Sequence, residues 1–158
     1  MVDTSVLVAG IVWPRWPYQV LQHAVQGDFQ LVLSPTIIEE ATRKFAVRFP
    51  AYQQEFESFL RECGYEPVAD LSAPEVLVHR GLMRDVTDVP IALAAIRAGV
   101  DVLVSEDKDF TIQNETTAEL HRHVTVMLSG TFLRQIMGWT SEELEAIRHR
   151  TWAELEDL

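Results

Sequence analysis

The sequence predicts an α/β domain in which helices cover both faces of a central, mainly parallel sheet, forming three α/β/α layers. Short apolar runs alternate with segments of helical periodicity along the 158 residues. Proline and glycine mark helix ends, as Pro35 and Gly99 do. The apolar content of 47% and charged content of 23% are those of an ordinary globular protein, and the length suits one core-forming domain.

The N-terminal third predicts two strands and two helices. Residues 1–2 are the end of a first strand. Residues 18–25 have helical periodicity, and residues 29–33 form a short apolar strand. Ser34 and Pro35 then provide an N-cap and a first helical residue for a helix that ends near Arg43 or Phe45.

The middle of the chain predicts a further helix, two short strands and an alanine-rich helix. Residues 52–63 place Phe56, Phe59 and Leu60 on one helical face. Residues 65–68 and 76–78 are short, apolar and predicted as strands. Thr87 is predicted to cap the helix of residues 88–98, with Pro90 in its first turn.

The C-terminal third predicts two core strands, 101–104 and 124–128, and a helix over 129–137. Thr140 and Glu143 have the spacing of a capping box that starts one last helix. The apolar residues on one side of that helix are Leu144, Ile147, Leu155 and Leu158, with Thr151 among them. We therefore divide the chain into a domain, 1–137, and a helical extension, 138–158, that packs on the domain or on a partner.

Charge and cysteine content limit the possible functions. The formal net charge of −11, from 13 basic and 24 acidic residues, argues against a nonspecific nucleic-acid binder. It does not exclude an enzyme that meets phosphate through a bound metal ion. Cys63 is the single cysteine, so no internal disulfide forms, and neither a signal peptide nor a membrane-spanning run is evident. We expect a cytoplasmic protein without membrane contact.

Four acidic residues lie where a strand ends or a helix begins: Asp3, Glu40, Asp88 and Asp107. The carboxyl ends of parallel strands share one edge of a sheet, so these side chains are expected to meet there. A divalent cation relieves the repulsion between such carboxylates, and oxygen ligands suit Mg²⁺ or Mn²⁺. By contrast, His121 and His123 have no further nitrogen or sulfur ligand nearby, and a zinc site is not expected.

The arrangement resembles the PIN domain, the ribonuclease fold of VapC-type toxins, from Asp3 to about Met137. The segments that carry the resemblance are 2–8, 34–40, 85–94 and 99–110. The resemblance implies the catalytic acids Asp3, Glu40, Asp88 and Asp107, the metal ligands Asp3, Asp88, Asp107 and Asp109, and the supporting hydroxyls Ser5 and Ser105. Between Asp85 and Asp88, the distance to Ile91 and Ala92 favours Asp88 as the ligand.

The function implied by the resemblance is metal-dependent cleavage of RNA by a metal-activated water. The protein would then be the toxin of a toxin–antitoxin pair, with a small antitoxin protein as partner and a homodimer as its assembly. Arg43, Lys44 and Lys108 lie near the acidic edge in sequence and are the candidate contacts to RNA. The alternative is a catalytically silent PIN-fold module that binds RNA or protein.

Overall fold

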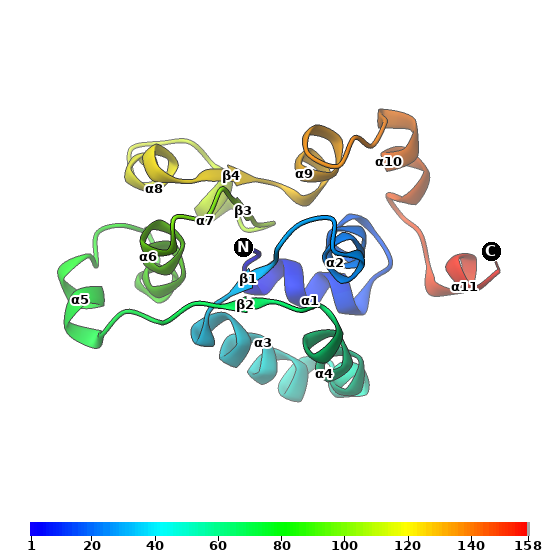
Figure 1. Ribbon diagram of the computed structural model, residues 1–158, viewed down its shortest axis with the longest axis horizontal. Helices are drawn as coiled ribbons and strands as arrows, with labels where there is room; N and C mark the ends of the chain where they lie inside the picture. The colour runs from blue at the N-terminus through cyan, green and yellow to red at the C-terminus, as the bar shows by residue number, and fades with distance from the viewer. Residues whose placement is uncertain (158) are drawn as a thin grey trace.

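Two pairs of short parallel strands lie at the centre of the molecule, with helices around them (Figure 1). The computed structural model describes residues 1–157. The strands are β1 Val32–Leu33, β2 Glu66–Pro67, β3 Val102–Val104 and β4 Thr125–Met127. The α-helices are α1 Thr4–Val12, α2 Trp16–Gln26, α3 Pro35–Arg48, α4 Gln53–Glu62, α5 Ala73–Val78, α6 Val89–Ala98, α7 Lys108–Thr111, α8 Ala118–His123, α9 Ser129–Gln135, α10 Ser141–Ile147 and α11 Trp152–Glu156. The 3₁₀-helices are η1 Pro50–Tyr52 and η2 Val86–Asp88.

The predicted α/β class and the parallel pairing are found, but one continuous central sheet is not formed within residues 1–157. β1 pairs with β2, and β3 pairs with β4, as two separate sheets. Each strand is only two or three residues long. The chain start, between the two sheets in Figure 1, adds a single bridge from Val2 to Val104. Such short strands cannot sustain a wide ladder, so helix packing carries most of the core.

The chain start is nevertheless paired with β3. The Met1 ammonium donates to the carbonyl of Val102 at 2.9 Å. The Val104 amide donates to the Met1 carbonyl, and the Asp3 amide donates to the Val104 carbonyl. Val2 is fully buried. This parallel pairing places Asp3 beside the carboxyl end of β3.

Three predicted elements differ from the structure because of local capping. Residues 76–78, predicted as a strand, lie in α5, whose first turn is fixed by the Ser72 hydroxyl accepting from the Glu75 amide. Asp85, not Thr87, caps the turn before α6. The single last helix is divided into α10 and α11, because Thr151 starts a second capping box with Glu154.

The C-terminal segment packs on the corner between α1 and α2. The indole of Trp16 donates to the carbonyl of Leu144 at 2.9 Å, and the indole of Trp152 donates to that of Val12 at 2.8 Å. Arg150 donates through Nε to the carbonyl of Pro14 at 2.7 Å. Leu158, expected on the apolar face of the last helix, lies outside the described residues. Over residues 1–157, every helix is too short or too polar to cross a bilayer.

The packing of the helical core predicts that two apolar residues of α3 contribute very differently to the free energy of unfolding. Phe45 is fully buried and stacks on Phe56 at a centroid distance of 4.7 Å, whereas Val47 is 82% exposed. Phe45→Ala is expected to lower the free energy of unfolding by about 3–5 kcal/mol, because it leaves a cavity. Val47→Ala is expected to change it by no more than about 0.5 kcal/mol. Urea unfolding followed by circular dichroism measures both, and equal losses would contradict this core.

Candidate metal centre

Asp3 is the buried anchor of the acidic region. Its side chain is 3% exposed and caps α1. Oδ1 accepts hydrogen bonds from the Ser5 hydroxyl at 2.6 Å and from the Val6 amide at 3.2 Å. Oδ2 accepts from the Ser105 hydroxyl at 2.5 Å. Both carboxylate oxygens are therefore fixed, and one hydroxyl comes from β3's end, 102 positions away.

The same two hydroxyls fix the turn that carries Asp107. Ser5 Oγ accepts from the Glu106 amide at 3.1 Å, and Ser105 Oγ accepts from the Asp107 amide at 2.9 Å. Asp107 in turn caps α7, with Oδ1 accepting from the Asp109 amide at 2.8 Å. Asp3 and Asp107 are thus positioned by one hydrogen-bonded unit.

Glu40 approaches this unit from α3. Its Oε2 accepts a hydrogen bond from the Thr4 hydroxyl at 2.8 Å, which links α3 to the start of α1. Its neighbour Glu39 is exposed, since adjacent residues of a helix point about 100° apart. The structure therefore separates the two acids as the sequence predicts: Glu40 faces inward and Glu39 faces solvent.

Asp88 lies at the junction of η2 and α6 and experiences the strongest accumulation of like charge. The pKa of its carboxyl is raised to about 7, first by partial burial. The negative charges of Asp107, Asp85, Asp109 and Glu40 contribute the rest of this rise, in that order. Burial also raises the pKa of Asp3 to about 6, against the opposing effect of its hydrogen bonds, and Asp107 adds to the rise. The predicted acids therefore interact electrostatically, through Asp107 and Asp88.

The tightest cluster includes Asp85, which is not among the predicted metal ligands. Asp85, Asp88 and Asp109 each offer one carboxylate oxygen, and these three atoms lie within 4.8 Å of one another. Asp88 is the predicted ligand of the two, but the spacing of three residues across a single helical turn indicates that Asp85 and Asp88 can both face one point. Asp3 and Asp107 are not part of this three-oxygen cluster and lie next to it in the electrostatic network.

Two of the clustered carboxylates have partners of their own. The Asp85 carboxylate accepts from the amide and the hydroxyl of Thr87, which lowers its pKa. Asp109 is held by Arg84, whose Nε and Nη2 donate to its two oxygens at 2.8 and 2.6 Å, and this pair lowers the pKa of Asp109. Asp88 has neither kind of partner among the side-chain hydrogen bonds of residues 1–157, so its charge is the least compensated.

The oxygen donors fit a divalent cation of the Mg²⁺ or Mn²⁺ type. The raised pKa of Asp88 comes first from its partial burial and then from the surrounding carboxylates, whose repulsion a bound cation would reduce. The histidines have other partners: His121 contacts the carbonyl of Phe110 and His123 contacts Glu119. The predicted cations Arg43, Lys44 and Lys108 are all exposed, the first two on α3 and the third at the start of α7.

The raised pKa of Asp88 predicts how metal-free stability depends on pH. The folded-state pKa lies above the ordinary 3.8, so the folded protein binds more protons than the unfolded chain between these values. The destabilisation is fully present above pH 7 and is relieved as the pH falls toward 4. In EDTA, Asp88→Asn is expected to be more stable than wild type at pH 7.5 by about 1–2 kcal/mol, a figure reduced for the partial exposure of this carboxyl.

The advantage of Asp88→Asn should shrink as the pH is lowered to 5, and Glu39→Gln, which alters an exposed acid, should follow wild type. Urea titrations at several pH values test both expectations. An advantage that persists unchanged at pH 5 would contradict the assigned cause.

Comparison with known proteins agrees with this geometry. A family model described as a PIN domain matches residues 1–109, a range that contains every acid of the centre. No curated protein matches the chain significantly. PIN domains are generally nucleases, and they use divalent metals. Because the match covers more than half of the chain, this protein belongs to the PIN domain family.

Proposed function

We propose that this protein is a divalent-metal-dependent endoribonuclease that hydrolyses phosphodiester bonds with a metal-activated water. The observation that carries the proposal is the convergence of acids around Asp88 from three segments of the chain, with Asp3 from a fourth segment coupled to them through Asp107. Asp85 precedes α6, Asp107 and Asp109 follow β3, Glu40 comes from α3, and Asp3 starts α1. Such clustering of like charge is costly to the fold unless a cation offsets it.

In this proposal each acidic residue and serine of the centre has a defined role. Asp3, Asp88, Asp107 and Asp109 hold Mg²⁺ or Mn²⁺, and Glu40 completes the site. When bound, the ion lowers the pKa of a water and offsets negative charge on the phosphate in the transition state. Cation binding favours the ionised form of Asp88, which is otherwise half-protonated near pH 7. Ser5 and Ser105 keep the Asp3 carboxylate oriented through the hydrogen bonds at 2.6 and 2.5 Å.

We propose that the protein contacts RNA only over a small area near the acidic centre. The net charge of −11 opposes broad binding to a polyanion, so phosphate neutralisation must come from few cations. Arg43 and Lys44 are exposed on the helix that carries Glu40, and Lys108 lies between Asp107 and Asp109 in sequence. We propose that these three cations contact phosphates that flank the scissile bond.

Cleavage of a mixed set of single-stranded and structured RNAs tests the proposal. Wild type is expected to cut with Mg²⁺ or Mn²⁺ and not with EDTA. Asp88→Asn, Asp107→Asn and Glu40→Gln are each expected to lower the rate by about 100-fold or more, as removal of a group that stabilises transition-state charge does. Glu39→Gln is the matched control, because it removes the adjacent, exposed acid of the same helix.

Circular dichroism of each variant should match that of wild type. Cleavage that survives in Asp88→Asn would contradict the assignment of this residue. Absence of cleavage by wild type in every metal, with RNA binding retained, would favour the catalytically silent RNA-binding module instead.

We further propose that the enzyme is the toxin of a toxin–antitoxin pair, a homodimer controlled by a protein antitoxin. A groove of about 680 Å³ between α2, α4 and α11 supports a protein partner. Apolar Leu21, Phe59 and Trp152 and acidic Glu55 and Glu62 contribute to its lining. That lining suits a basic, amphipathic helix of an antitoxin.

Induced expression in a bacterial host tests the toxin role. Wild type is expected to arrest growth within a few generations, because RNA cleavage stops protein synthesis. Asp88→Asn at equal abundance is expected to permit growth. Normal growth with active, soluble wild type would contradict the toxin role while leaving the nuclease proposal intact.

A further inference from the structure

One arginine is in direct contact with the acidic cluster. Arg84 places its guanidinium against Asp109 as a two-pronged fork, with Nε to Oδ1 at 2.8 Å and Nη2 to Oδ2 at 2.6 Å. Asp109 also offers one oxygen to the three-oxygen cluster with Asp85 and Asp88. The carboxylate that a divalent cation would share is therefore already neutralised by a cation of the chain itself.

This pair is set apart from the other ion pairs of residues 1–157. The others join His23 to Asp28, Glu119 to Arg122 and His123, and Glu145 to Arg148, none of which belongs to the acidic centre. The Asp109 side chain is 20% exposed, so the pair is partly screened from water on the carboxylate side. A bidentate arginine–carboxylate pair in such a place is stronger than an ordinary surface pair.

The position of the Arg84 backbone is fixed by the residues on either side of it. Leu82 and Met83 are buried in the core just before it, and the Leu82 amide donates to the carbonyl of His79 at 2.9 Å. Asp85 follows immediately and caps η2. Arg84 thus projects from a short segment that is held at both ends, while its own side chain stays 71% exposed. It can leave Asp109 for solvent without disturbing the core.

We propose that Arg84 is a resident counter-ion of the centre that competes with the divalent cation for Asp109, an inference that rests on the proposed metal-dependent function. When no ion is bound, the guanidinium offsets the repulsion that Asp109 exerts on Asp85 and Asp88. When an ion binds, Asp109 is attracted to both cations, and the shared carboxylate weakens each interaction. Arg84 therefore lowers the affinity of the centre for metal.

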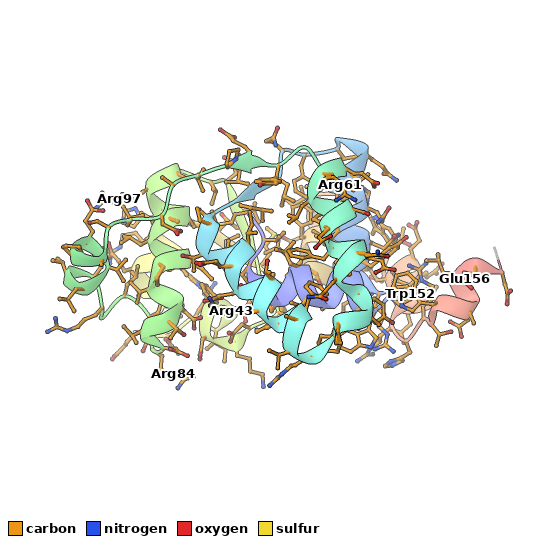
Figure 2. The ribbon with its side chains drawn as sticks, turned by 90° about the horizontal axis from the view of Figure 1, so that it is seen from below. Arg43, Arg61, Arg84, Arg97, Trp152 and Glu156 are labelled. Atoms are coloured by element: carbon orange, nitrogen blue, oxygen red, sulfur yellow. The ribbon has the colours of Figure 1, made fainter. Side chains whose placement is uncertain are left out.

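Calorimetric titration of Mn²⁺ into the metal-free protein tests this competition without any cleavage assay. Arg84→Gln is expected to tighten Mn²⁺ binding by about 10-fold, within the usual range of coupling between two sites. The matched control is Arg97→Gln, which removes an exposed arginine at the opposite end of α6 (Figure 2) and should change affinity less than about twofold by long-range charge alone.

A double-mutant cycle separates competition at Asp109 from a general charge effect. In an Asp109→Asn background, Arg84→Gln is expected to lose most of its effect, because the carboxylate for which the two cations compete is absent. A full effect that persists in that background would overturn the inference. So would unchanged or weaker Mn²⁺ binding by Arg84→Gln when wild type binds the ion.

The titration also distinguishes failure of this inference from failure of the proposed function. If wild type binds Mn²⁺ and Asp88→Asn does not, the metal centre is supported. The affinity of Arg84→Gln then tests the role of Arg84 alone. If wild type and Arg84→Gln both fail to bind Mn²⁺, the metal centre and the competition are overturned together.

Discussion

The hydrogen bonds of one buried carboxylate, that of Asp3, hold the functional region together. Ser5, the Val6 amide and Ser105 all donate to it, and Ser105 stands at the end of β3. The same two serines accept from the amides of Glu106 and Asp107. The start of α1 and the turn after β3 are consequently one hydrogen-bonded unit. Within residues 1–157 the strand pairing of the chain start is confined to Met1–Asp3 against β3, so this unit does the positioning that a wide sheet would otherwise do.

The buried position of Asp3 makes its negative charge unfavourable, and this electrostatic cost extends to the other acids of the centre. Burial disfavours its charge, and Asp107, fixed by the same serines, adds repulsion. Asp107 is also the strongest of the charged neighbours that act on Asp88. The fold therefore holds several carboxylates together at the expense of its own stability, a feature typical of sites selected for binding or catalysis rather than for folding.

The sequence predicted what depends on local pattern and missed what depends on contacts between distant segments. Ser34-Pro35 and Thr140 with Glu143 mark helix starts that are found, because a cap is a short-range interaction. The strand predicted at 76–78 was wrong, since the cap at Ser72 and Pro74 favoured a helix over the preference of valine for strands. The proximity of Asp3 and Asp107 could be predicted from strand ends, because each follows a segment that pairs in parallel with the other. The contact of Arg84 with Asp109 spans 25 positions, and no sequence periodicity encodes it.

The distribution of charge sets the condition under which so acidic a chain could bind a polyanion, as the proposed function requires. A net charge of −11 opposes approach over most of the surface, so attraction must be concentrated where cations gather. Among residues 1–157, the carboxylates of the centre outnumber the one arginine, Arg84, that forms an ion pair with them. A divalent ion there would offset part of this negative charge and would present a positive centre to a phosphate oxygen. Under the proposed function, phosphate binding and metal binding are physically coupled, because the bound ion reduces the repulsion that a phosphate would otherwise meet at these carboxylates.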